Sequence, residues 1–111
     1  MNQRSLPSEI GFSDGEVVSY RREGDELAVV VKAWNERKIA LIFKSVASFS
    51  DYGAGDISDV VEVDGSSSYM DQALKRIYEA PPANHEYHHY QFLDVSGAPV
   101  IEIVATSAKL I

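Results

Sequence analysis

The sequence predicts an α+β domain: an antiparallel sheet of about five or six strands with one helix packed on one face. The run from Leu27 to Phe49 is mostly apolar and contains β-branched residues such as the three consecutive valines, which pack well on a pleated surface but lose rotamer freedom in a helix. Short turn signals separate this run from others like it, and tight turns join antiparallel strands. The segment at about 69–79 has the spacing of an amphipathic helix.

Two strands of the apolar run form the predicted centre of the sheet. The first extends from Glu26 to Trp34, and the polar insert Asn35 to Lys38 has a length that joins antiparallel strands. Side chains of the second strand alternate between two faces. The two sets are Ile39, Leu41 and Phe43 against Ala40, Ile42 and Lys44.

Further strands are expected on both sides of this hairpin. One runs from Glu16 to Glu23, and Gly24-Asp25 then supplies a two-residue turn whose glycine adopts a positive φ. The apolar residues of the segment Ile57 to Val63 fit neither the period of a strand nor that of a helix. A short strand is favoured, and a helix is the alternative. The chain closes with strands at about Glu86 to Val95 and Val100 to Thr106.

The predicted helix begins near Tyr69 and ends near Glu79. Ser68 and Asp71 have the spacing of a capping box. Lys75 lies in the second half of the helix, where the helix dipole favours cations. The sequence Ala80-Pro81-Pro82 then ends the helix, because proline cannot continue it.

Composition limits the class of protein. The 111 residues fit a single domain, 1–111, with residues 1–11 as an irregular lead-in. The chain has no cysteine, which excludes disulfides and thiol nucleophiles. No signal-peptide core is present, and no run approaches the roughly 20 apolar residues that span a bilayer, so a cytoplasmic location is predicted.

The charge balance bears on partners. There are 17 acidic and 10 basic residues, for a net charge of −7. Phosphate backbones and anionic membranes attract clustered Lys and Arg, so neither nucleic acid nor membrane is an expected partner. An acidic surface fits a basic protein partner, and solubility alone is the alternative explanation.

The three histidines, His85, His88 and His89, are the weak candidates for a metal site. On a strand, His85 and His89 would point to one face but lie roughly 13 Å apart, while His88 would point to the other. A structural or solvated role is therefore favoured, and no metal, cofactor or catalytic residue is predicted. A histidine–carboxylate enzyme using His88 or His89 is the alternative.

A stretch without basic residues follows Lys44 and continues to Lys75. Its carboxylates lack the ligand pattern of a calcium loop, and they are either solvated or part of a negative face for a cationic protein. Trp34 is added because tryptophan often anchors interfaces. The predicted partner-binding residues are Asp51, Asp56, Asp59, Glu62, Asp64 and Trp34.

The runs LAVVVKAWNERKIALIFKSVASF, GDISDVVEV and HYQFLDVSGAPVIEIVATS together resemble small bacterial proteins of uncharacterised domain families, including immunity-type proteins. The resemblance implies a β-rich α+β fold and a protein-binding role. We therefore expect a noncatalytic interaction module that binds a basic protein. The alternative is a homo-oligomeric structural or regulatory protein that associates through a sheet face left open by the helix.

Overall fold

The computed structural model describes residues 3–6, 12–63, 67–80 and 85–111. The described part of the chain contains ten strands and one helix. In chain order these are β1 (Gln3–Ser5), β2 (Gly15–Glu23), β3 (Glu26–Lys32), β4 (Lys38–Lys44), β5 (Ser48–Asp51), β6 (Asp56–Ile57), β7 (Asp59–Val63), α1 (Ser68–Lys75), β8 (His88–Leu93), β9 (Pro99–Ala105) and β10 (Ser107–Leu110).

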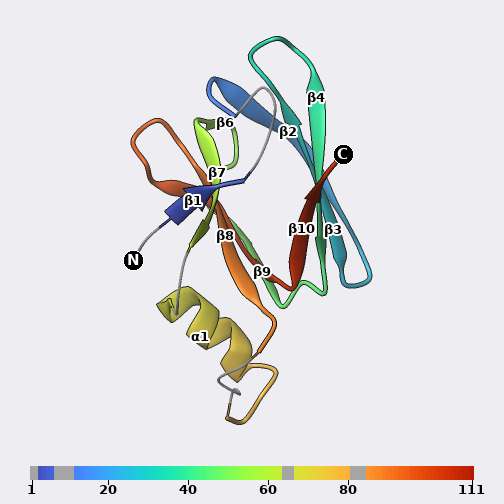
Figure 1. Ribbon diagram of the computed structural model, residues 1–111, viewed down its shortest axis with the longest axis vertical. Coiled ribbons are helices and arrows are strands. Elements are labelled where there is room, and N and C mark those ends of the chain that lie inside the picture. Colours follow the sequence, from blue (N-terminus) through green and yellow to red (C-terminus); the bar gives the residue numbers. More distant parts are fainter. Residues whose placement is uncertain (1–2, 7–11, 64–66, 81–84) are drawn as a thin grey trace.

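The strands form two antiparallel sheets that face each other (Figure 1). Sheet A has the order β1-β7-β8-β9-β5, and sheet B has the order β10-β4-β3-β2-β6. The predicted α+β class with antiparallel strands and one helix is confirmed for the described residues, and the strands are divided between two five-stranded sheets where a single sheet was expected. From β4 onward the chain changes sheets within short breaks, at residues 45–47, 52–55, Ser58 and Thr106. Two sheets are favoured because each buries the apolar inner face of the other.

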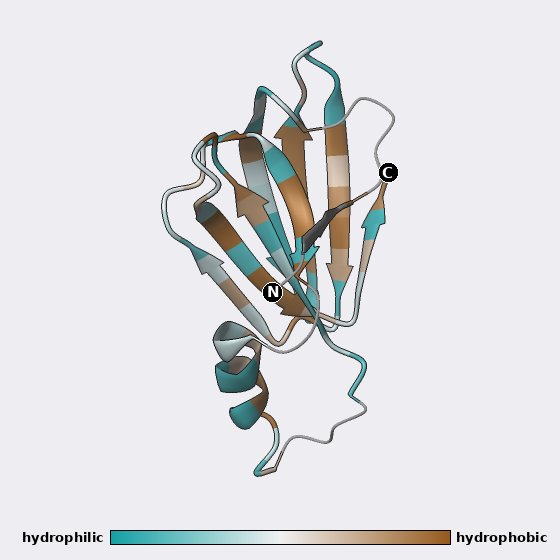
Figure 2. Ribbon diagram, turned by 60° about the vertical axis from the view of Figure 1, so that its left-hand side comes forward, coloured by the Kyte–Doolittle hydropathy of each residue, from teal (hydrophilic) through white to brown (hydrophobic). Residues whose placement is uncertain are grey.

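The main core lies between the two sheets. Sheet B contributes Leu27, Val29, Val31, Leu41 and Phe43, and sheet A contributes Val60, Tyr90, Phe92, Ile101 and Ile103. The ring of Phe43 lies 5.3 Å from that of Tyr90 and 6.1 Å from that of Phe92, measured between centroids. Figure 2 shows the resulting alternation of hydrophobic and hydrophilic bands along the strands.

Several predicted local features are present. Gly24 has a φ of +62° in the β2–β3 turn, as the two-residue hairpin requires. Leu41 and Phe43 face the core, while Ile42 is half-buried on the other face. Residues 33–37 connect β3 to β4, so Trp34 lies in the turn and not in the strand.

Other boundaries differ from the prediction. Residues 57–63 are extended, yet Ser58 divides them into β6 of sheet B and β7 of sheet A. The lead-in contains β1, which pairs with β7; residues 1–2 and 7–11 lie outside the described residues. Strand β10 was not predicted, because only its pairing with β4 identifies so short a segment as a strand.

The helix is shorter than predicted and starts from a different cap. Ser67, not Ser68, is the N-cap, because its side-chain oxygen accepts a hydrogen bond from the backbone N–H of Met70. The α-helix ends at Lys75, and the backbone N–H groups of Ile77 and Tyr78 both donate to the carbonyl of Leu74. In the part of the chain described, no helix is long and apolar enough to span a membrane.

The helix packs on the outer face of sheet A, near one end of the molecule (Figure 1). The buried members of this contact are Met70, Ala73, Leu74 and Val104. None of them belongs to the buried core between the sheets. The helix is therefore held by a small apolar cluster of its own.

The register of β4 can be tested by paired truncations. Leu41→Ala should lower the free energy of unfolding by about 2 to 5 kcal/mol, because it leaves a cavity in the main core. The neighbouring Ile42→Ala should cost about 1 kcal/mol, since Ile42 is half-exposed on the outer face. Urea unfolding monitored by circular dichroism measures both, and equal losses would contradict the assigned faces.

Candidate functional site

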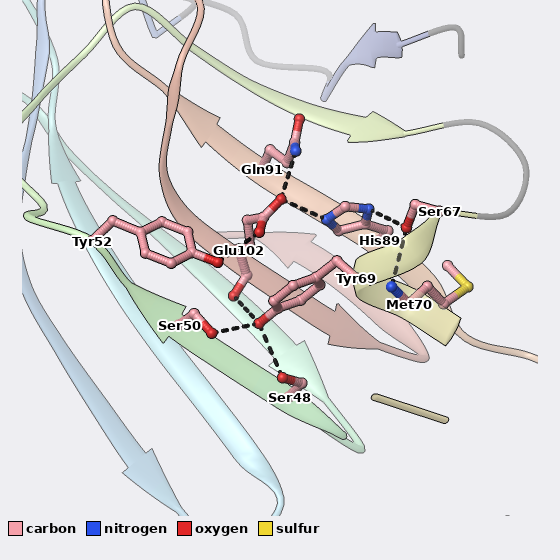
Figure 3. Close-up of polar contacts among 9 residues, drawn as sticks. All are labelled: Ser48, Ser50, Tyr52, Ser67, Tyr69, Met70, His89, Gln91 and Glu102. Atoms are coloured by element: carbon pink, nitrogen blue, oxygen red, sulfur yellow. Dashed lines mark hydrogen bonds and ion pairs between the residues drawn. The ribbon is translucent and has the colours of Figure 1, made fainter. Parts of the chain in front are cut away.

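A buried polar network lies between helix α1 and the outer face of sheet A (Figure 3). Its centre is His89 on β8, which is 2% exposed. Because Tyr90 and Phe92 face the main core, alternation along β8 turns His89 toward the helix. Its Nδ1 lies 2.8 Å from Ser67 Oγ, and its Nε2 lies 3.1 Å from Glu102 Oε1.

The hydrogen bonds assign a tautomer to His89. Ser67 Oγ already accepts the N–H of Met70 at 3.1 Å, so the hydroxyl proton is available to donate to His89 Nδ1. Nε2 then carries the ring proton and donates to Glu102. The neutral imidazole thus links the cap of the helix to a carboxylate on β9.

Glu102 collects three donors. Oε1 accepts from His89 and, at 2.7 Å, from Nε2 of Gln91, while Oε2 accepts from the Tyr52 hydroxyl at 2.7 Å. The residue is 8% exposed. Burying a carboxylate is costly unless it is hydrogen-bonded, and three donors offset that cost.

Tyr69 adds a second link between the helix and the sheet. Its ring stacks on the imidazole of His89, with centroids 5.1 Å apart and planes inclined by 20°. Its hydroxyl lies 3.0 Å from Ser48 Oγ and 2.8 Å from Ser50 Oγ, and it donates to the carbonyl of Glu102 at 3.2 Å. The first turn of α1 is therefore bonded to β5, β8 and β9.

The environment shifts two titrations in this network. Burial lowers the pKa of His89, and the opposing effect of the Glu102 carboxylate is smaller. Burial, followed by the hydrogen bond to Glu102, raises the pKa of Tyr52. At neutral pH His89 is therefore neutral and Tyr52 keeps its proton.

The order serine, histidine, carboxylate is also that of a hydrolase triad. A nucleophilic hydroxyl must reach its substrate, whereas Ser67 is 6% exposed and its oxygen caps the helix. All three groups are occupied in joining helix to sheet. The geometry therefore indicates a structural role, in which these groups hold helix α1 on sheet A.

The three histidines do not converge. His88 lies on the opposite face of β8, where its Nδ1 is 3.1 Å from Glu62 Oε2. His85 precedes the strand, and its Nδ1 accepts the backbone N–H of Tyr87 at 3.2 Å. Among the described residues no group of three or more His, Cys, Asp or Glu side chains could hold a metal ion.

The predicted acidic residues that the structure describes are spread over β5, β6 and β7. Asp51 ends β5, where it accepts the Tyr20 hydroxyl and two backbone N–H groups, and these bonds lower its pKa. Asp59 accepts the N–H of Val60 within β7, and Glu62 pairs with His88. Asp64 lies outside the described residues.

Asp56 and Trp34, by contrast, share one end of the two-sheet body, which we call the loop end. Here a cavity of about 390 Å³ opens beside β6. Hydrogen bonds from the Ser96 side chain and the Ala98 backbone lower the pKa of Asp94 in its wall. The cavity is lined by Ser13, Asp14, Gly15, Asp56, Ile57, Ser58, Asp94 and Val95.

Sequence reasoning missed Ser67, Glu102, Gln91, Tyr52 and Tyr69 as partners in one network. One signal was present: Glu102 is a lone carboxylate within an apolar strand, between Ile101 and Ile103. A carboxylate so placed must find donors. The donors come from residues up to 50 positions away in sequence, so only the folded arrangement identifies them.

The role of Ser67 can be tested against its neighbour. Ser67→Ala should destabilise the protein by about 1 to 2 kcal/mol, because the helix loses its cap and His89 loses a buried donor. Ser68→Ala, at an exposed position one residue later, should cost under about 0.5 kcal/mol. Thermal or urea unfolding measures both. A larger loss for Ser68→Ala would show that the cap is assigned wrongly.

Comparisons with known proteins found no match to this chain. No family model matches the chain, and no curated protein or solved structure matches it either. The immunity-type resemblance therefore supports a proposal only, and the functional argument depends on the geometry.

Proposed function

We propose that this protein is a noncatalytic interaction module, of immunity-like type, that binds a basic protein partner at its loop end. The observation that supports the proposal is the cavity there: its described lining residues include three aspartates, Asp14, Asp56 and Asp94, and no lysine or arginine. Two large apolar side chains are exposed at the same end: Trp34 is 63% exposed and Val95 is 95% exposed.

This combination has the composition of a protein-binding surface. Exposed aromatic and aliphatic side chains supply contact area, and tryptophan is enriched among residues that dominate binding energy. Carboxylates around a concavity attract a lysine or arginine side chain and accelerate encounter with a basic surface. Short loops on a rigid two-sheet body position these groups.

The proposal predicts charge-dependent binding to one partner. A tagged wild-type chain should retain a basic protein from the source cell, and retention should fall as salt rises. The double variant Asp14→Asn, Asp56→Asn should weaken binding by about tenfold or more, because interfacial charge pairs are worth roughly 1.4 kcal/mol or above. Asparagine suits position 14, where φ is +56°.

The matched control is Asp25→Asn, which removes a charge from the β2–β3 turn at the opposite end of β2. This control should bind as the wild type does. Equal binding by the double variant, or recovery of an acidic partner, would contradict the proposal.

Homo-oligomerisation stays a prediction. The one helix of the described residues packs on sheet A and not on the outer face of sheet B, which carries half-buried apolar side chains: Ala28, Val30, Ala40 and Ile42. A second copy would bury them. Light scattering at high concentration tests this, and a monomeric mass throughout would contradict it.

A further inference from the structure

We propose that His89 is a proton-sensitive latch: protonation of its imidazole undocks helix α1 from sheet A while the core between the two sheets stays folded. The proposal is independent of the loop end, which lies at the other end of the molecule (Figure 1). It is argued from two features of the network in Figure 3 and from the apolar packing of the helix.

The first feature is the number of hydrogen-bonding sites. In the docked form Ser67 Oγ accepts from Met70 N and donates to Nδ1 of His89. A protonated imidazole is a donor at both nitrogens. Ser67 Oγ would then have to accept from Met70 and His89 together, and its own proton would lose its acceptor. Protonation therefore opposes the docked hydrogen-bond pattern at the helix cap.

The second feature is burial with a single counter-charge. His89 is almost completely buried, so a positive charge there loses its hydration. Among the described residues the titratable groups that contact its ring are Glu102 on β9 and Tyr69 on α1. Glu102 is shared with Gln91 and Tyr52, and Asp71 and Lys75 on the helix are exposed to solvent. Glu62 lies across the strand beside His88.

The third feature is that the helix can leave without opening the core. Its buried residues Met70, Ala73 and Leu74 contact Val104 in a cluster separate from the one between the sheets. Local unfolding follows such boundaries between packed units. Undocking would expose the apolar side of α1 and the polar residues of β5, β8 and β9.

The direction of the pH dependence follows from linkage. The pKa of His89 is lower in the docked form than its ordinary value, so the undocked form binds more protons as the pH falls. The docking contribution is fully present above about pH 6.5, the ordinary value for histidine. It is lost progressively as the pH falls below that value toward the pKa of the docked form.

Hydrogen exchange measured site by site at about pH 7.5 and about pH 5.5, and corrected for intrinsic rates, tests the latch. Amides of residues 70–76 should lose protection at the lower pH, while amides of β3 and β9 keep theirs. His89→Gln retains a donor toward Glu102 but cannot titrate, so its helix protection should be the same at both pH values. His88→Gln, on the opposite face of β8, should behave as the wild type does.

Three results would overturn the proposal. They are unchanged helix protection in the wild type, simultaneous loss of core protection, and a pH response that persists in His89→Gln. If His89→Gln does not fold, an NMR titration of the His89 imidazole in the wild type tests the proposal instead. A pKa at or above the ordinary histidine value, with helix protection unchanged, excludes the latch.

Discussion

The packing of one sheet against the other is the constraint on which the rest of the structure depends. Phe43 of sheet B fits between Tyr90 and Phe92 of sheet A, and both β8 and β9 must turn these apolar faces inward. Because side chains alternate between the two faces of a strand, the residues between these core positions must point to the outer face. His89, Gln91 and Glu102 are directed outward because their neighbours are directed inward.

Outward placement would normally expose such residues to water. Here helix α1 covers one end of that face, so an imidazole and a carboxylate are buried against a second, smaller cluster. Their burial is tolerable because every partner is supplied: Ser67 and Tyr69 by the helix, Gln91 by the same sheet, and Tyr52 by the segment after β5. The helix is thus attached both by its own apolar cluster and by polar contacts, of which those of His89 depend on protonation state.

The molecule separates its features by location. At one end, short loops bring together carboxylates and exposed apolar side chains around a cavity. At the other, a buried and fully bonded network joins helix to sheet. Exposed charge favours binding to an oppositely charged partner. Exclusion of water instead strengthens the hydrogen bonds that hold the helix on the sheet. The first arrangement supports the proposed binding surface, and the second attaches the helix to the sheet.

The sequence by itself determined the type and approximate place of the main strands and of the helix. Period-two alternation located β4 and the apolar strands, Gly24 located the tight turn, and the amphipathic spacing located the helix. These features depend on neighbours along the chain, so composition and spacing were sufficient. The N-cap was predicted wrongly: Ser67, not Ser68, caps the helix, and its hydroxyl also contacts His89 on β8.

Only the tertiary structure decided how the strands divide between two sheets and which polar groups meet. A break as short as Ser58 sends β6 and β7 to different sheets, and no local pattern distinguishes that break from a bend within one strand. The register of β8 against β9 places Gln91 opposite Glu102. Such pairings are set by the packing of the whole core, because the energy that selects them comes from contacts between residues distant in sequence.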